Sequence, residues 1–391
     1  MLDQVTSIAK DAVPGVRGGR IHVCHLIHSL GSGGAEQLLV EFAEAAPAAG
    51  MQTTVVSLMG TNGSRYADRL HSAGARVLSV DLATRWDIRA FARVEALLER
   101  VRPDVLQTHL KHADVVGSWA ARRLALPMVS TLHRIEQGGT AAERFKQAVG
   151  ARARLARADR TVAVSHAQRR WYLDAFKADP SRVVTVHNGI REPAPMTATE
   201  RAEVREELGI GSDETVVTML GVMRPGKGHT DLLEAARLIP RELPVRFVMA
   251  GEGELAGGIW RTVQGDPLLA HRVILPGWRE DVDRLLGASD VLVHPTRDDA
   301  FPTAVIHGLA AGLPVVASEV GGVPELVEAG AGILVPPASP RALADALVEL
   351  IGDRDRRAAM GRRARERFER EFTASAWVER LGAVYREVLG R

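Results

Sequence analysis

The chain has 391 residues, which is enough for two domains of ordinary size. Hydrophobic residues make up 46% of it and charged residues 25%, a globular composition that argues against an intrinsically disordered protein. The formal net charge of +2 gives no reason to expect a nucleic-acid partner. Cys24 is the single cysteine, so a disulfide framework and a cysteine metal site are excluded, and we expect a cytoplasmic protein with this thiol in its core.

Neither the start of the chain nor its least polar stretch predicts a membrane-spanning segment. Residues 1–19 carry charges and Pro14 without a continuous apolar run, so we expect a disordered tail and not a signal peptide. Residues 305–323 are weakly polar, but His307, Gly312 and Pro314 interrupt them. A helix, a turn and a strand are the better interpretation of that stretch.

Short β-rich runs alternate with longer helical patterns between Arg20 and residue 190. The predicted strands are residues 21–27, 53–59, 76–80, 105–108, 128–132, 161–164 and 183–186. The predicted helices are residues 35–46, 88–100, 114–124, 141–156 and 167–175. This alternation is typical of βαβ units, so we expect an α/β domain with a mainly parallel sheet over residues 20–190.

Residues 191–204 interrupt the alternation with two prolines and small polar residues, and we predict an interdomain linker there. The alternation then restarts, with predicted strands at 215–220, 245–250, 273–275, 291–293 and 314–317 and a helix at 231–238. A second α/β domain is expected over residues 205–371, followed by a C-terminal helical segment, 372–391. Asp281 and Asp283 begin a helix after Arg279 and are interpreted as capping charges.

The run 144–160 is rich in arginine. It carries Arg144, Lys146, Arg152, Arg154, Arg157 and Arg160 against Asp159 within the run and Glu143 just before it. One interpretation is a solvated helix face. The alternative is a patch that docks on anionic lipid or an anionic acceptor.

The first loop of chemical interest follows the opening strand. Gly33 and Gly34 let backbone N–H groups approach a phosphate, and the helix after them offers its positive end. A tight structural turn would give the same pattern. A nicotinamide site is a poorer interpretation, because residues 53–59 lack the acid that would hold a ribose.

A second loop follows the first strand of the second half. Arg224 and Lys227 lie three residues apart among glycines and a proline, ahead of a helix. A departing diphosphate needs fixed positive charge, and this loop supplies it without a metal. The alternative is a pair of exposed surface cations.

The third loop runs from Asp299 to His307. Pro302 suits the first turn of a helix, which would leave the N–H groups of Thr303 and Ala304 as an anion site. Val305, Ile306 and Leu309 would form the apolar face, while His307 shares the side of Thr303, four residues away. A ligand-facing His307 competes with a simple surface histidine.

Ten short motifs in this order resemble the retaining glycosyltransferases of the GT-B fold, family 4. They are Gly33-Gly34-Ala-Glu36, Thr131-Leu-His133, Ala163-Val-Ser165, Asn188-Gly189, Gly221 to Arg224 and Lys227-Gly-His229, Gly251-Glu-Gly253, Asp290-Val-Leu-Val-His-Pro295, Asp299-Ala-Phe-Pro302, Ala311-Gly-Leu-Pro-Val-Val-Ala-Ser318 and Gly321-Gly-Val-Pro-Glu325. The resemblance covers nearly the whole chain from Arg20 onward.

The resemblance implies two Rossmann-like domains facing each other across a cleft, with the last helix crossing back to the first domain. It implies transfer of a hexosyl unit from a UDP- or GDP-linked sugar to a sugar, lipid-linked or small-molecule acceptor, with retention of configuration and without metal or other cofactor. The implied catalytic residues are His133, Arg224, Lys227 and Asp299. The implied donor contacts are Gly33, Gly34, Arg224, Lys227, Asp299, Phe301, Thr303, Ala304 and His307. The basic run 144–160 would allow peripheral contact with the inner membrane face.

Two positions depart from the family pattern. Asp299 and His307 stand where the family often carries glutamates eight residues apart. Asp299 keeps a carboxylate on a shorter arm, whereas the imidazole of His307 can accept a hydrogen bond from only one ribose hydroxyl. Two alternatives therefore stand beside the transferase: a catalytically impaired binding partner and a nucleotide-sugar epimerase of the same fold.

Overall fold

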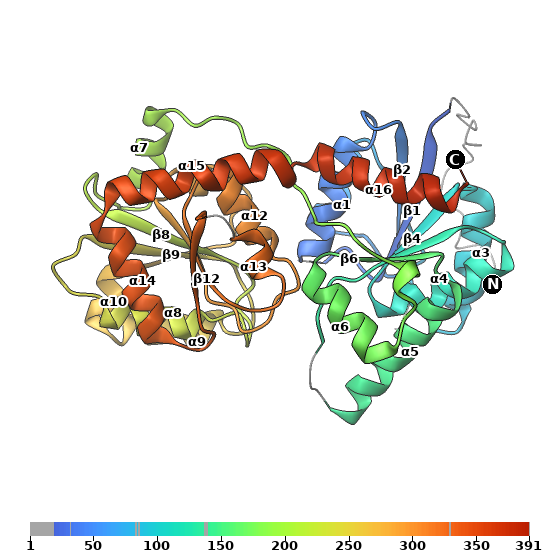
Figure 1. The fold of residues 1–391 in the computed structure, drawn as a ribbon, viewed down its shortest axis with the longest axis horizontal. Helices are drawn as coiled ribbons and strands as arrows, with labels where there is room; N and C mark the ends of the chain where they lie inside the picture. Colours follow the sequence, from blue (N-terminus) through green and yellow to red (C-terminus); the bar gives the residue numbers. More distant parts are fainter. Residues whose placement is uncertain are drawn as a thin grey trace.

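The computed structural model describes residues 19–31, 33–82, 84, 87–136, 140–327 and 330–390. The expected tail over residues 1–19 lies outside the described residues except for Gly19. Two α/β domains stand side by side, each with a parallel sheet between layers of helices (Figure 1). No helix in the described part of the chain is long and apolar enough to cross a membrane.

The first domain is built on a seven-stranded parallel sheet with the order β3-β2-β1-β4-β5-β6-β7. Its strands are β1 (Ile21–Ile27), β2 (Met51–Ser57), β3 (Arg76–Ser79), β4 (Val105–His109), β5 (Met128–Thr131), β6 (Arg160–Ala163) and β7 (Val183–Thr185). Its helices are α1 (Gly34–Ala45), α2 (Arg65–Ser72), α3 (Arg89–Val101), α4 (Lys111–Arg123), α5 (Ala141–Arg157) and α6 (His166–Phe176), with a short 3₁₀ turn at Pro180–Arg182. The strand order reverses at β1 and β4, and a doubly wound fold binds ligands at such a reversal.

The second domain repeats this arrangement with a six-stranded sheet in the order β10-β9-β8-β11-β12-β13. Its strands are β8 (Thr215–Leu220), β9 (Val245–Ala250), β10 (Val273–Gly277), β11 (Val291–His294), β12 (Val315–Ser318) and β13 (Gly332–Val335). Its helices are α8 (His229–Leu238), α9 (Ala256–Gln264), α10 (Pro267–Arg272), α11 (Val282–Gly287), α12 (Thr303–Ala310), α13 (Val323–Leu326), α14 (Pro340–Gly352) and α15 (Arg354–Glu371).

The predicted linker 191–204 is extended only in its first part, because helix α7 (Ala198–Glu207) begins within it. Thr197 starts this helix with a capping box, in which its side chain and Glu200 satisfy each other's backbone N–H groups. Proline and small residues dominated the sequence pattern here, and the capping pair Thr197 and Glu200, three residues apart, was overlooked.

Helix α16 (Ala374–Val388) joins the C-terminus to the first domain, as the red ribbon in Figure 1 shows. Trp377 and Tyr385 of this helix pack edge-on against Phe42 of α1, and the Tyr385 hydroxyl donates to the side-chain oxygen of Gln107 in β4. Gly189 lies against the turn before α16, where an added Cβ would come 2.4 Å from the carbonyl oxygen of Thr373. The close approach of the two chain segments therefore requires glycine.

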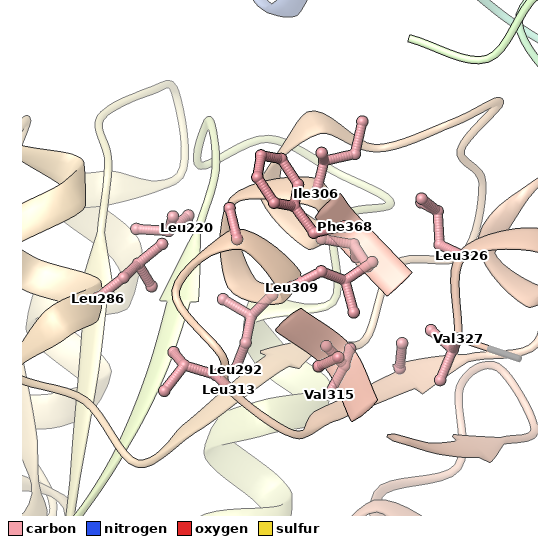
Figure 2. Close-up of a cluster of buried hydrophobic side chains, with 14 of the residues drawn as sticks. Leu220, Leu286, Leu292, Ile306, Leu309, Leu313, Val315, Leu326, Val327 and Phe368 are labelled. Carbon is pink, nitrogen blue, oxygen red and sulfur yellow. The ribbon is translucent and has the colours of Figure 1, made fainter. Parts of the chain in front are cut away.

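The core of the second domain orients helix α12 (Figure 2). Val305, Ile306 and Leu309 are fully buried, and Ile306 and Leu309 lie in one apolar cluster with Phe368 of α15. This confirms the apolar face that the sequence predicted for residues 303–310. The opposite face of the helix, which carries Thr303 and His307, lines the cleft between the domains.

Candidate active site

A cleft of about 1280 Å³ separates the two domains and is lined by residues of both. Every residue that the sequence suggested for the site borders it: Gly33, Gly34, His133, Arg224, Lys227, Asp299, Phe301, Thr303, Ala304 and His307. The volume is large enough for a nucleotide-linked sugar, since ligand pockets commonly measure some 300–1,000 Å³.

Two helix N-termini face each other across this cleft. Helix α1 begins at Gly34 and helix α12 begins at Thr303, and a Cβ built on Gly34 would lie 3.5 Å from the Thr303 hydroxyl oxygen. The N–H groups of Thr303 and Ala304 have no backbone acceptor among the described residues. Both positive helix ends thus point to one place, which favours an anion there.

Pro302 is the residue that caps α12 and does not lie within its first turn, so the sequence placed it one residue too far inside the helix. Its extended backbone, with ψ of 121°, is the conformation of a capping residue. The expected pair of free N–H groups is unaffected, because they belong to the next two residues.

The loop of Arg224 and Lys227 forms another wall of the cleft. Gly228 closes this loop with φ of +81°, and an added Cβ would lie 1.9 Å from the carbonyl oxygen of Pro295, so only glycine fits. The loop is thereby held against the end of β11. None of the described residues forms an ion pair with Arg224, whereas Lys227 Nζ lies 2.5 Å from Asp299 Oδ2.

Asp299 is therefore already paired with Lys227 in the absence of a ligand. Burial favours a raised pKa for its carboxyl, but the hydrogen bond from His294, at 3.3 Å, and the charge of Lys227 outweigh this and hold the pKa well below its usual range. The resemblance implied that each residue contacts a donor separately, yet the two form one ion pair. An ionised Asp299 orients Lys227 and keeps an acceptor oxygen for a ligand hydroxyl.

His133 extends from the end of β5 to the first-domain wall of the cleft. Its Nε2 is 2.8 Å from Nδ1 of His109, a second histidine at the end of β4. Burial is the main reason that the pKa of His133 falls to about 4, with Asp114 and Arg154 acting in opposite directions. The imidazole is therefore neutral near pH 7.

His307 lies beside the carboxylate of Asp283, which the sequence suggested as a capping charge. Asp283 Oδ1 is 3.6 Å from His307 Nδ1, and its Oδ2 is 2.6 Å from a guanidinium nitrogen of Arg191. Asp281 occupies the capping position of α11 but makes no capping hydrogen bond, because its carboxylate pairs with Arg279. Asp281 and Asp283 do lie at the start of a helix, as predicted, but Asp281 makes no capping hydrogen bond and Asp283 faces His307 and Arg191. Asp283 could not be found from spacing, since Arg191 and His307 are distant in sequence.

The ring of Phe301 is only 4% exposed. It stacks on the ring of His187 with centroids 4.8 Å apart and lies edge-on to Phe372. Most of the Phe301 ring is thus occupied in packing, while part of the residue still borders the cleft, so its contact with a donor stays a prediction. Its neighbours Thr303 and Ala304 remain at the cleft surface.

Glu325 ties the two domains together at the side of the cleft. Its carboxylate accepts hydrogen bonds from the backbone N–H groups of His166 and Ala167, the first residues of α6, at 2.8 and 2.7 Å. It also lies 2.9 Å from Nε2 of His187. Among the described residues, His166, His187 and Glu325 are the group whose ligand atoms lie close enough to hold a metal ion. No sequence spacing predicted this group, because its members are up to 159 residues apart.

Two Rossmann-like domains that face each other across a cleft are the architecture of the GT-B fold. Two family models match the chain: Glycosyltransferase Family 4 over residues 32–192 and Glycosyl transferases group 1 over residues 200–367. The chain belongs to this family of glycosyltransferases.

Its relatives are enzymes of sugar transfer. It is 31% identical over 322 residues to a D-inositol 3-phosphate glycosyltransferase of Thermobispora bispora, covering 76% of this chain and 74% of the relative. It is 27% identical over 250 residues to an Escherichia coli UDP-Gal:alpha-D-GlcNAc-diphosphoundecaprenol alpha-1,3-galactosyltransferase, covering 60% and 63%. The fold also matches HepE of Anabaena, solved in complex with UDP-glucose, with a TM-score of 0.82, 21% identity and coverage of 94% and 100%.

Proposed function

We propose that the protein transfers a hexosyl unit from a UDP- or GDP-linked sugar to an acceptor hydroxyl, with retention of anomeric configuration and without a metal ion. The observation that carries this proposal is the convergence of the Arg224–Lys227 loop and the N-termini of α1 and α12 on one cleft. A diphosphate is the part of such a donor that requires this much fixed positive charge. The relative named for a UDP-sugar reaction and the HepE complex with UDP-glucose support a nucleotide-sugar donor.

In this proposal the second domain holds the nucleotide and the first domain holds the acceptor. The bond between the anomeric carbon and the diphosphate breaks as the acceptor oxygen forms its new bond on the same face. The acceptor's proton passes to an oxygen of the departing phosphate. Arg224 and Lys227 stabilise the charge that develops on the diphosphate, and His133 contacts the transferred sugar or the acceptor from the opposite wall.

The acceptor is proposed to be a sugar, a lipid-linked sugar or another small hydroxyl compound. A surface near the membrane would suit a lipid-linked acceptor, and the start of α5 offers one. Arg144, Phe145, Val149 and Arg152 are exposed there, and the Phe145 side chain is 67% exposed. Arg154 does not contribute, because it is buried in an ion pair with Asp114. Sedimentation with vesicles that contain anionic phospholipid, using a Phe145→Ser variant as the comparison, tests this contact.

Calorimetric titration tests the donor. UDP, GDP, UDP-glucose and GDP-mannose are titrated into the protein, and saturable binding of one nucleotide class with 1:1 stoichiometry is expected. Absence of binding to all four would refute the proposed donor class. The anomeric configuration of the glycoside product, read by proton NMR, then distinguishes retention from inversion.

Chelation tests metal independence. Activity is expected to survive EDTA, because fixed cations and helix ends supply the charge that a metal would otherwise bring. Loss of activity that Mg²⁺ or Mn²⁺ restores would contradict this part of the proposal.

A further inference from the structure

Three histidines form a continuous hydrogen-bonded row from the core of the first domain to the cleft. Nδ1 of His25 lies 3.0 Å from Nε2 of His109, and Nδ1 of His109 lies 2.8 Å from Nε2 of His133. His25 is 1% exposed and His109 is 5% exposed. Their three rings also follow one another closely, with centroids 5.3 and 5.1 Å apart.

The register of the parallel sheet creates this row. His25 of β1 is level with Gln107 of β4, and His109, two residues further along, is level with Thr131 of β5. His133 lies two residues beyond Thr131. Because side chains alternate between the faces of a strand, each step of two keeps the histidines on one face while moving them toward the cleft.

The row allows only two arrangements of protons while the rings are neutral. A neutral imidazole carries one N–H donor and one acceptor nitrogen, so each ring that donates to one neighbour must accept from the other. Burial lowers the pKa of all three histidines, that of His25 to about 3 and that of His133 to about 4. The tautomer of His25 therefore determines that of His109, which in turn determines that of His133.

The buried end of the row favours one arrangement. Nε2 of His25 is buried and has no hydrogen-bond partner among the described residues. The adjoining internal void measures about 10 Å³, at the lower limit of the space that one water molecule needs. Among buried backbone groups an N–H without an acceptor is rarer than an oxygen without a donor, and we apply the same preference to this imidazole nitrogen. Nε2 of His25 should then be the unprotonated nitrogen.

We propose that His25 and His109 are positioning residues that hold His133 as its Nδ1–H tautomer, so that His133 offers the cleft a hydrogen-bond donor. Protons would lie on Nδ1 of each ring, and His133 Nε2 would accept from His109. Nδ1 of His133 has no partner among the described residues and is not among the buried unpaired atoms, so it is available to a ligand. Its target is an oxygen acceptor, such as a hydroxyl oxygen of the sugar. That last assignment rests on the proposed function, whereas the tautomer does not.

NMR of protein labelled with ¹⁵N-histidine tests the proposal without any ligand. Imidazole nitrogens that carry a proton resonate far from those that do not. In the wild-type protein at pH 7, His133 is expected to show a protonated Nδ1 and an unprotonated Nε2. The opposite tautomer, or an even mixture of the two, would overturn the proposal.

Variants of the middle histidine separate positioning from simple packing. In His109→Leu the row is broken, and His133 is expected to move toward the Nε2–H tautomer, which is the commoner form of a free imidazole. In His109→Gln the amide can accept from His25 and donate to His133, so the wild-type tautomer should persist. An unchanged His133 spectrum in His109→Leu would contradict the proposal. If that variant does not fold, His25→Leu provides the same comparison from the far end.

His22→Leu is the matched control. His22 lies on the same strand, but its ring bonds to Thr54 and takes no part in the row. Its replacement should leave the His133 signals in place. The rate of UDP-glucose hydrolysis is then compared: His109→Leu should lower kcat at least tenfold with little change in KM, and His109→Gln should recover part of the loss. If the tautomers change as expected but no variant hydrolyses UDP-glucose, the positioning role stands and UDP-glucose is not the donor.

Discussion

Lys227 and Arg224 illustrate how much the environment of a single residue changes its expected role. Both were found from the sequence as cations in a glycine loop, yet only Lys227 has a carboxylate partner, Asp299. Arg224 is half-buried at the cleft wall and forms no ion pair with a described residue. The pair Lys227–Asp299 is preformed, while Arg224 is free to meet an incoming anion.

Removal of either cation should reduce turnover about 10²-fold or more, the usual effect of losing one charge contact to a transition state. Lys227→Ala should also destabilise the protein, since it leaves the buried carboxylate of Asp299 without its cation. Arg224→Ala should leave stability unchanged. Steady-state kinetics and thermal denaturation measure the two effects, with exposed Arg261→Ala as a control. Near-normal rates in both variants would place the diphosphate elsewhere.

The pair of His307 and Asp283 gives a second prediction at this scale. A carboxylate lies beside His307, so replacing His307 by glutamate would set two carboxylates against each other. We expect Asp283→Asn to weaken UDP binding by about 1.4 kcal/mol, or tenfold, the size of one hydrogen bond to a charged group. His307→Glu alone should not tighten binding.

The double variant distinguishes this interpretation from independent effects. His307→Glu combined with Asp283→Asn returns one carboxylate to the site and should recover most of the affinity, so the two changes would be strongly non-additive. Calorimetric titration of UDP into the four proteins measures the coupling. Additive changes would show that the two side chains do not share a ligand.

At the scale of the element, the starts of helices α1 and α12 at the cleft could be predicted from the sequence. The side chains from other elements that meet at the cleft could not. Glycines before α1 and Pro302 before α12 mark helix starts in sequence. The strongly amphipathic α2 was missed, although Tyr66, Ala67 and Leu70 are buried at helical spacing, because polar residues dominate that segment. β13, a strand of four residues among glycines, gave too short a pattern to be found. The contacts of Asp283, Glu325 and the histidine row depend on tertiary packing, which spacing does not encode.

The contact between Glu325 and the N-terminus of α6 can be tested by substitution. The carboxylate satisfies two free N–H groups of the helix and adds negative charge at its positive end. Glu325→Gln should lower the free energy of unfolding by about 1–2 kcal/mol and loosen the contact between the domains. Urea denaturation and small-angle X-ray scattering measure these effects, with exposed Glu319→Gln as a control. Equal stability and equal radius of gyration would refute the role.

For the whole molecule, the two-domain α/β architecture could be predicted because hydrophobic periodicity reports it directly. Strands β1, β8 and β9 have the predicted bounds, and each is an interior strand of a parallel sheet. The pKa shifts of the buried titratable groups could not be predicted, because they arise only when elements distant in sequence pack together. Histidines are among the buried groups whose pKa values shift most.

These histidines give the folded protein a defined response to acid. Burial lowers the pKa of His25 to about 3 and those of His133 and His229 to about 4, and that of His109 falls well below its usual value. In the unfolded chain each should titrate near 6.5. Between pH 6.5 and about 4 the unfolded state therefore binds protons that the folded state does not. Stability should be full above pH 6.5 and fall as the pH drops, by up to about 1.4 kcal/mol per pH unit for each histidine.

The variant His229→Gln isolates the contribution of one histidine to this pH dependence of stability. His229 is 2% exposed, and burial together with the charge of Lys227 keeps it neutral, so His229→Gln should make the slope of stability against pH shallower, by an amount that approaches one proton between pH 6 and 5. Exposed His71→Gln should leave the slope unchanged. Urea denaturation at several pH values in this range provides the slopes, and carboxylates contribute little because they titrate below it. If His229→Gln and the wild-type protein lose stability at the same rate, His229 is protonated in the folded state and the charge of Lys227 does not reach it.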